Sequence, residues 1–196
     1  NNTMTNVGLY DLTPFSKFEI NSSSAHKELQ KMCTSNIKHE IGKCTYTHML
    51  NKDGGIETDL TVVCLDENHF RIISSAATRE RDKFHIKKHL SEKTELNDVT
   101  DEYCVFGVFG PKSRLLMQKL SKDDFSNENF KFATSKFITI DEKRIWAQRL
   151  SYVGELGYEL YIKYSNARDI YKKIIEEGKN FNISNCGMHA LDTMRM

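Results

Sequence analysis

Two acidic side chains lie in segments that are expected to be strands, and they are the carboxylates best placed to do chemistry. Asp59 precedes the run Leu60-Thr61-Val62-Val63, where a strand normally presents β-branched and apolar side chains. Glu159 lies between Tyr158 and Leu160, so its carboxylate points to the opposite face from its apolar neighbours. The local pattern alone favours an aspartate on the surface of an edge strand and a glutamate on the wet face of a hairpin.

A metal centre is not favoured by the histidine spacing. His85 and His89 stand four residues apart on an expected helix and could in principle ligate one ion. The intervening Ile86-Lys87-Lys88 provides neither a third ligand nor a general-base glutamate. We therefore expect a solvated helix face and no metal.

The sequence also contains a short glycine motif and several aromatic residues. Gly107-Val108-Phe109-Gly110 precedes an expected helix but lacks the third glycine, the lysine and the hydroxyl residue of a phosphate loop. It is interpreted as a tight junction between strand and helix. Four aromatic side chains could stack on bases or rings, but core packing is the better explanation of their spacing. They are Phe130, Phe132, Phe137 and Trp146.

The elements that must position these side chains are mostly strands. Alternation and turn signals predict strands at residues 44–50, 59–65, 70–73, 103–109, 137–140, 145–151 and 158–163. Helical spacing predicts helices at residues 25–32, 76–90, 113–120 and 166–177. We expect the run Ser22-Ser23-Ser24 to cap the first helix, Pro111 to start the third and Gly178 to end the fourth. A tight turn at Asp53-Gly54-Gly55 favours antiparallel pairing. The expected class is α+β, with mainly antiparallel sheets and interspersed helices.

The bulk composition restricts the kinds of partner. The 196 residues carry a formal net charge of +1, so no global field attracts nucleic acid or an anionic membrane surface. No stretch approaches the roughly 20 apolar residues that cross a bilayer. The five cysteines are widely spread without C-x-x-C spacing, which favours reduced structural thiols. We expect the cytoplasm, or the mitochondrial matrix in a eukaryote.

Three segments together resemble a known family. They are Cys44-Thr45-Tyr46-Thr47-His48-Met49-Leu50-Asn51, the stretch from Gly54-Gly55 to Thr58-Asp59-Leu60-Thr61-Val62, and Tyr152-Val153-Gly154-Glu155-Leu156-Gly157-Tyr158-Glu159-Leu160. This wording resembles the folate-binding aminomethyltransferases, which include the glycine-cleavage T-protein and the C-terminal halves of dimethylglycine and sarcosine dehydrogenases. Within the family it is most similar to the sarcosine dehydrogenase branch. Leu191 stands where the T-protein branch has an arginine, which argues against plain glycine-cleavage activity.

The resemblance implies a division of labour at a tetrahydrofolate site. It assigns Asp59 to the carboxylate beside the reacting atoms, where it can stabilise a cationic intermediate and take up a proton. It assigns Glu159 to the pterin ring, whose adjacent amino and ring N–H groups suit a carboxylate. Tyr46, Ile73 and Ser75 match other positions that contact the folate.

The resemblance further implies that residues 1–196 are a partial folate-binding domain. The sequence stops at Met194-Arg195-Met196 within an expected helix, and relatives of this kind continue beyond it. FAD is expected only in an N-terminal half outside this chain, if there is one. The implied reaction condenses a one-carbon unit from an N-methyl amino acid onto tetrahydrofolate and forms 5,10-methylenetetrahydrofolate. Two alternatives stay open, a non-catalytic regulatory paralogue like the regulatory subunit of pyruvate dehydrogenase phosphatase and a standalone aminomethyltransferase.

Overall fold

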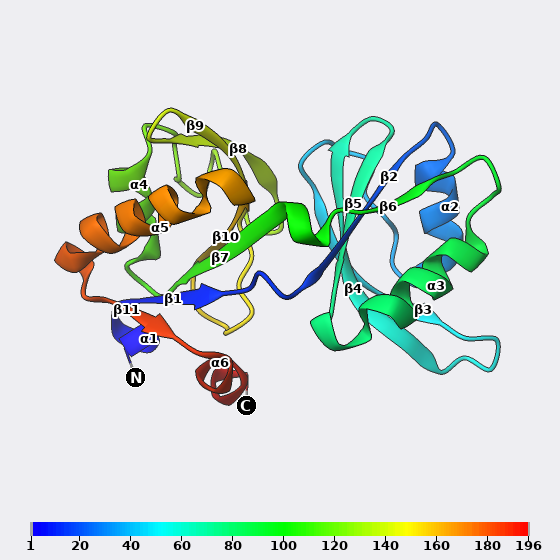
Figure 1. The fold of residues 1–196 in the computed structure, drawn as a ribbon, viewed down its shortest axis with the longest axis horizontal. Coiled ribbons are helices and arrows are strands. Elements are labelled where there is room, and N and C mark those ends of the chain that lie inside the picture. The colour runs from blue at the N-terminus through cyan, green and yellow to red at the C-terminus, as the bar shows by residue number, and fades with distance from the viewer. Residues whose placement is uncertain (1, 196) are drawn as a thin grey trace. The chain divides into compact units, whose positions relative to one another are not determined.

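The chain folds as two compact units in a computed structural model that describes residues 2–195 (Figure 1). Unit 1 contains residues 2–13 and 102–195, and unit 2 contains the continuous segment Pro14–Asp101. Each unit is built on one sheet with its own hydrophobic core.

Unit 2 is a five-stranded antiparallel sheet with two helices packed on one face. The strand order is β3-β4-β5-β2-β6. Its strands are β2 (Ser16–Asn21), β3 (Cys44–Leu50), β4 (Ile56–Asp66), β5 (His69–Ser74) and β6 (Leu96–Asp98), and its helices are α2 (Ala25–Met32) and α3 (Arg79–His89). Alternate strand residues such as Phe18, Leu60 and Ile72 pack with Leu29 of α2 and Ile86 of α3. The other sheet face carries the residues between them.

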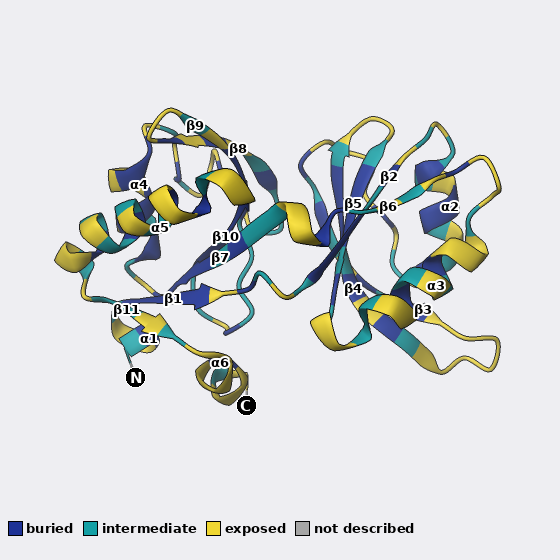
Figure 2. Cartoon of the chain, viewed as in Figure 1, coloured by how far each residue is buried: buried dark blue, intermediate teal, exposed yellow. Residues whose placement is uncertain are grey.

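Unit 1 is a six-stranded sheet in the order β11-β1-β7-β10-β9-β8. Its strands are β1 (Val7–Asp11), β7 (Tyr103–Phe109), β8 (Ser135–Ile140), β9 (Lys143–Gln148), β10 (Gly157–Lys163) and β11 (Ile183–Cys186), and its helices are α1 (Asn2–Thr5), α4 (Ser113–Leu120), α5 (Tyr164–Gly178) and α6 (Met188–Met194). Helices α4 and α5 bury their apolar sides against Val108, Tyr158 and Leu160, and Figure 2 shows buried and exposed residues alternating along α5. All pairs are antiparallel except β1 with β11.

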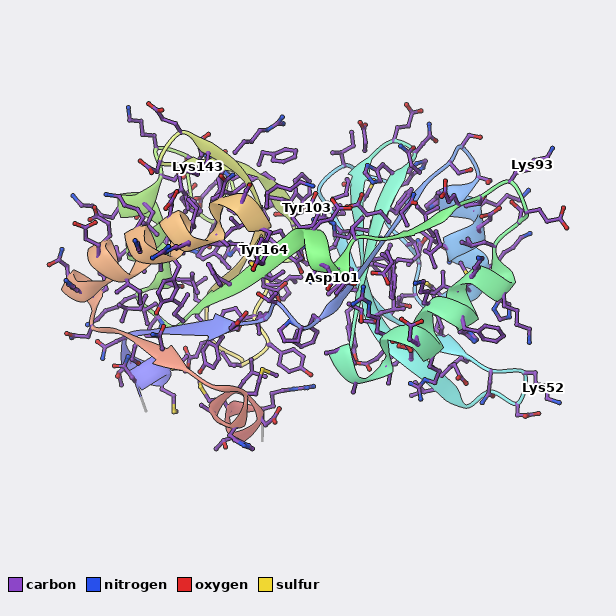
Figure 3. All side chains as sticks on the ribbon, viewed as in Figure 1. Lys52, Lys93, Asp101, Tyr103, Lys143 and Tyr164 are labelled. Atoms are coloured by element: carbon purple, nitrogen blue, oxygen red, sulfur yellow. The ribbon has the colours of Figure 1, made fainter. Side chains whose placement is uncertain are left out.

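The predicted α+β class with mainly antiparallel sheets is confirmed. The predicted elements at 25–32, 44–50, 103–109 and 113–120 have the observed bounds. The turn between β3 and β4 is also present, with Lys52 at its tip in Figure 3 and Gly54 at φ 81°. The predicted strand 145–151 is wrong at its end, because β9 stops at Gln148 and the chain then runs irregularly to Gly157.

The predicted helix ends need correction. Ser24 is the N-cap of α2, but its hydroxyl donates to Glu28 at 3.1 Å instead of capping a backbone amide. Helix α4 begins at Ser113 after the N-cap Lys112, so Pro111 precedes it rather than occupying its first turn. Helix α5 ends at Gly178 as predicted, but Gly178 has a φ of −68° instead of a left-handed conformation, and the 3-10 turn Lys179–Phe181 that follows ends at Asn182 with φ 54°. A Cβ on Gly178 would meet Ile183 Cγ2 at 2.6 Å, so glycine is needed there for close packing.

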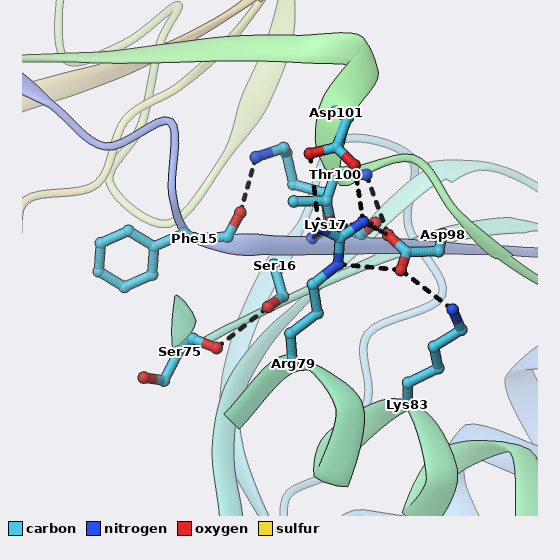
Figure 4. Close-up of polar contacts among 9 residues, drawn as sticks. All are labelled: Phe15, Ser16, Lys17, Ser75, Arg79, Lys83, Asp98, Thr100 and Asp101. Atoms are coloured by element: carbon cyan, nitrogen blue, oxygen red, sulfur yellow. Dashed lines mark hydrogen bonds and ion pairs between the residues drawn. The ribbon is translucent and has the colours of Figure 1, made fainter. Parts of the chain in front are cut away.

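An ion-pair cluster joins α3 to the strand edge of unit 2 (Figure 4). Arg79 donates to both carboxylate oxygens of Asp98 at 3.0 Å and to Asp101 at 3.0 Å. Lys83 adds a contact to Asp98 at 3.3 Å. Burial would raise the pKa of Asp98, but these donors outweigh it and hold that pKa well below its usual range. The cluster fixes the end of β6 against α3.

Candidate functional site

Asp59 lies on the sheet face of unit 2 that points away from the core. Thr58 and Leu60 are buried while Asp59 is exposed, which is the alternation of a half-buried strand. Strand β4 is not an edge strand, because β3 and β5 pair on its two sides. An exposed carboxylate in the interior of the sheet is thus supported by a rigid backbone on both sides.

Tyr46 is the direct hydrogen-bond partner of Asp59. Its hydroxyl donates to Asp59 Oδ2 at 3.0 Å across the β3–β4 pair. His48 stands directly opposite Asp59 in register, and its ring meets the Tyr46 ring edge-on at a centroid distance of 5.3 Å. Tyrosine, histidine and aspartate therefore form one polar group on this face, and sequence reasoning had assigned no role to His48.

Ile73 shares the sheet face of Tyr46 and Asp59, whereas Ser75 lies just beyond the end of β5. Thr61 of β4 pairs with Tyr46 on one side and with Ile73 on the other, so all three side chains share a face. Ser75 follows the end of β5, where its hydroxyl accepts from Ala77 N at 3.3 Å and caps a 3-10 turn at Ala76–Thr78. Its carbonyl accepts from Ser16 Oγ at 3.0 Å. Ser75 is thus committed to local structure.

A second carboxylate on this face is fully committed to a cation. Glu19 Oε1 accepts from Arg71 Nη2 at 2.6 Å and Nε at 2.9 Å, and Oε2 contacts His69 Nε2 at 2.9 Å. Burial acts to raise the pKa of Glu19, but the bond to His69 and the charge of Arg71 lower it to about 2. The network was not predicted, since its partners lie 50 and 52 residues apart.

Glu159 occupies the middle of the unit 1 sheet, on the face opposite the one that α4 and α5 cover. Cross-strand partners form one row through Cys186, Tyr10, Gly107, Glu159, Gln148 and Ser135. Glu159 is half-buried, and Tyr161 donates to its Oε2 at 3.1 Å. Burial raises the pKa of Glu159 to about 7 although the Tyr161 hydrogen bond acts in the opposite direction. Its carboxylate is therefore poised between its charged and neutral forms near neutral pH.

The glycines beside Glu159 make room for an aromatic ring. A Cβ on Gly107 would meet Phe109 Cζ at 2.6 Å, and a Cβ on Gly157 would meet Phe109 Cδ1 at 2.4 Å. Phe109 is fully buried and contacts the Tyr10 ring at a centroid distance of 5.4 Å. The interpretation of Gly107–Gly110 as a tight junction is supported by Gly110, whose φ of 124° and approach to the Asn6 and Thr3 carbonyls exclude a side chain.

Gln148 stands directly opposite Glu159 and has no protein partner in the described part of the chain. Its exposed fraction is 0%, and neither Nε2 nor Oε1 forms a hydrogen bond within residues 2–195. Trp146 Nε1, two residues along the same strand and on the same face, is likewise without a partner among those residues. Each buried unpaired group of this kind costs about 1–3 kcal/mol. This polar lining is the feature of the site that sequence reasoning missed.

The aromatic residues and the histidine pair that the sequence singled out lie in different environments. Phe130 and Trp146 are buried as expected, but Phe132 and Phe137 are 70% and 46% exposed, so their assignment to the core is wrong. Phe137 lies between Arg144, 3.6 Å from its centroid, and the edge of Trp146. His89 Nδ1 contacts the His85 carbonyl at 2.8 Å. Within residues 2–195 no group of three or more His, Cys, Asp or Glu side chains is arranged to hold a metal ion.

Two shallow pockets adjoin Tyr10 and Cys186 in unit 1. One, of about 290 Å³, is closed by α6 through His189, Thr193 and Met194, and the other, of about 300 Å³, is closed by Tyr171 of α5. None of the five predicted site residues lines either pocket. No helix within the described range 2–195 is both long and apolar enough to span a membrane.

Comparisons with known proteins agree on one family. Residues 1–196 match the family described as the GCVT N-terminal domain. The chain is 33% identical over 196 residues to the mitochondrial dimethylglycine dehydrogenase of Rattus norvegicus, covering 98% of this chain and 23% of that protein. It is 29% identical over 190 residues to an aminomethyltransferase of Halothermothrix orenii, covering 96% of this chain and 53% of that protein.

A solved structure shows the same fold. Glycine cleavage system aminomethyltransferase T from Bartonella henselae superposes with a TM-score of 0.85 at 20% identity, over 99% of this chain and 51% of that one. The aminomethyltransferase fold that the sequence predicted is thereby confirmed. This chain spans about a quarter of the dehydrogenase and about half of each aminomethyltransferase.

Proposed function

Because the chain belongs to the GCVT N-terminal domain family, we propose that it binds tetrahydrofolate and takes part in one-carbon transfer. The protein containing it would resemble the dimethylglycine and sarcosine dehydrogenases, which would release the one-carbon unit from an N-methyl amino acid and form 5,10-methylenetetrahydrofolate. The observation that supports this most is Glu159, a half-buried carboxylate with a pKa of about 7 that forms no ion pair with any of residues 2–195. A group in that state gains most from a ligand that brings hydrogen-bond donors.

Glu159 is the proposed anchor for the pterin ring. The ring presents an amino group and an adjacent N–H as two donors in one plane, and an ionised carboxylate supplies two acceptors in one plane. Tyr161 already donates to Oε2 at 3.1 Å and holds the carboxylate in position. The fit is supported by the unpartnered amide of Gln148 across the strand pair, since a polar ligand would satisfy it.

Asp59 is the proposed catalytic carboxylate. Tetrahydrofolate, when bound, supplies the nitrogen that receives the one-carbon unit. Asp59 would stabilise positive charge on the incoming unit and accept the proton that is released, and both tasks require an ionised and oriented carboxylate. The Tyr46 hydroxyl, 3.0 Å from Oδ2, fixes that orientation. Ile73 and Ser75 are proposed to contact the folate as well, and FAD is proposed only for a flavin half outside this chain.

Calorimetric titration with tetrahydrofolate tests the assignment. Glu159→Ala is expected to weaken binding at least tenfold, while Asp59→Ala keeps affinity within about threefold and lowers the rate of transfer. Glu155→Ala is the matched control, because Glu155 lies in the same segment before β10. Equal affinity of the wild type and Glu159→Ala would remove the anchor assignment.

A standalone aminomethyltransferase is the second candidate, and the 29% identity to such an enzyme favours it. The two functions differ in the donor that they require. A dehydrogenase-type protein would load tetrahydrofolate from an oxidised N-methyl amino acid. An aminomethyltransferase would need an aminomethyl group presented by a carrier. A transfer assay with each donor separates them, and activity with neither would favour the regulatory paralogue.

A further inference from the structure

The amide of Gln148 is the strongest unexplained polar feature of unit 1. A side chain at the centre of a sheet, with 0% exposure, would ordinarily be apolar or paired. Instead both polar atoms of Gln148 lack a hydrogen-bond partner within residues 2–195. Retaining such a group destabilises the free protein, so a binding role is a physical reason for keeping it.

The cross-strand neighbours of Gln148 show which side chains share its sheet face. Glu159 and Gln148 form one cross-strand pair, and Tyr161 and Trp146 form another pair of the same two strands. Residues two apart on a strand share a face, so the four side chains line one surface. Three polar atoms of this surface lack partners in the described chain, namely Nε2 and Oε1 of Gln148 and Nε1 of Trp146.

The different exposure of Glu159 and Gln148 indicates from which side a ligand would bind. Glu159 is partly exposed whereas Gln148 is not. The backbones of the two residues are one strand spacing, about 5 Å, apart. Tyr161 uses Oε2 of Glu159, and Oε1 receives no hydrogen bond from residues 2–195. The Glu159 and Gln148 side chains project from adjacent strands on the same sheet face.

We propose that Gln148 is a second ligand-binding residue of this site, with its amide nitrogen donating to the carbonyl oxygen next to the pterin edge that Glu159 holds. The proposal rests on the proposed function. Along that edge the amino group and ring N–H are donors and the adjacent carbonyl is an acceptor. A carboxylate can satisfy only the donors, whereas a glutamine N–H satisfies the acceptor. The two opposite side chains together match the whole edge.

The test uses two apolar variants, Gln148→Met and Gln148→Leu, in the otherwise unchanged protein. Methionine keeps the length of the side chain and removes both hydrogen-bonding atoms. The expected result is tetrahydrofolate binding that is about tenfold weaker, with a melting temperature of the free protein that is equal or higher. A purely structural glutamine would instead lower the melting temperature. Gln118→Met, on the exposed side of α4, is the matched control.

A second probe shows which part of the ligand is contacted. A reduced pterin without the aminobenzoyl-glutamate tail, such as 6-methyltetrahydropterin, should lose the same factor in affinity as tetrahydrofolate. A loss confined to tetrahydrofolate would place the contact on the tail and overturn the proposal. So would unchanged affinity in folded variants, or failure of both variants to fold.

These outcomes are distinct from a failure of the proposed function. If the wild-type protein does not bind tetrahydrofolate, the function itself is wrong. If the wild type binds and Glu159→Gln weakens binding but Gln148→Met does not, the function stands and only the role of Gln148 falls.

Discussion

The two units each hold a half-buried glutamate on the sheet face away from their helices, and the two glutamates are in opposite electrostatic states. In unit 2, Glu19 is bound by Arg71 and His69, which lower its pKa to about 2. In unit 1, the Tyr161 hydroxyl is the one side-chain partner of Glu159 in the described part of the chain, and burial raises the pKa of Glu159 to about 7. The sheet position is similar, so the difference comes from the partners.

This difference separates a structural carboxylate from one that is available for binding. Glu19 already has a bidentate cation, so a ligand would have to displace Arg71 to use it. Glu159 is held in position but remains incompletely satisfied. A perturbed carboxylate without a counter-ion is a candidate for function, whereas one inside an ion-pair network is a candidate for stability. Substitutions at the two glutamates should therefore have different consequences.

Glu19→Ala is expected to destabilise unit 2 by about 3–5 kcal/mol, because it leaves the Arg71 guanidinium, whose side chain is 4% exposed, without its carboxylate. Hydrogen exchange of the β2 and β5 amides would report the change within that unit. The exposed pair Glu40–Lys43, at 3.8 Å, provides the control, since Glu40→Ala should cost less than about 1 kcal/mol. A small effect at Glu19 would contradict the structural reading.

Glu159→Gln is expected to stabilise the protein at pH 8 and to change little at pH 4. A carboxyl whose pKa is higher in the folded than in the unfolded state loses stability as the pH rises from about 4.5 to about 7. Removing the charge recovers at most about 3 kcal/mol above pH 7. Denaturant unfolding at both pH values measures it. If the variant and the wild type had the same free energy of unfolding at pH 8, burial of the ionised Glu159 carboxylate would not destabilise the folded state.

Tetrahydrofolate binding is expected to weaken about tenfold between pH 8 and pH 6. Glu159 is mainly protonated at pH 6 because its pKa is about 7, and a tenfold change follows for each pH unit below that value. Binding should release a proton, which calorimetry in buffers of different ionisation enthalpy detects. In Glu159→Gln this pH dependence should disappear, and its persistence would assign the titration to another group.

Tyr46→Phe removes the hydroxyl that donates to Asp59 and keeps the aromatic ring. Both side chains are exposed, so the expected loss is about 0.5–1 kcal/mol, or two- to fivefold in transfer rate. Tyr164→Phe, at a tyrosine that is 73% exposed in unit 1, controls for the loss of a hydroxyl. Unchanged transfer in Tyr46→Phe would mean that the hydroxyl does not orient Asp59.

Local sequence signals predicted much of the fold and less of the site. The hairpin of β3 and β4 and helix α4 combine a clear period with glycine or proline punctuation, so their positions follow from residues close together in the chain. Strands β1 and β11 were missed, since they are short and pair with each other over 170 residues apart, as Val7 with Ile183. No local pattern encodes that contact.

Within the site, family-like wording identified Asp59, Glu159 and Tyr46, and their roles stay proposals. Gln148 and His48 were not recognised as site residues. Each is placed at the site by the residue opposite it on a neighbouring strand, and the sequence alone does not show that pairing. Phe132 and Phe137 were wrongly assigned to the core for a related reason. Phe137 lies in the short strand β8 and Phe132 shortly before it, and the sequence does not show which side of such a segment is left exposed to solvent.

The discontinuity of unit 1 has a consequence for synthesis on the ribosome. Strand β1 is made before unit 2, and its partners β7 and β11 follow only after unit 2 has been made. At typical elongation rates the intervening stretch of about 90 residues takes roughly 5–20 s. During that time unit 2 can fold from its continuous segment, while the largely buried strand β1 lacks β7 and β11 to pair with. Val7–Asp11 is therefore expected to be accessible to chaperones until β7 has been made.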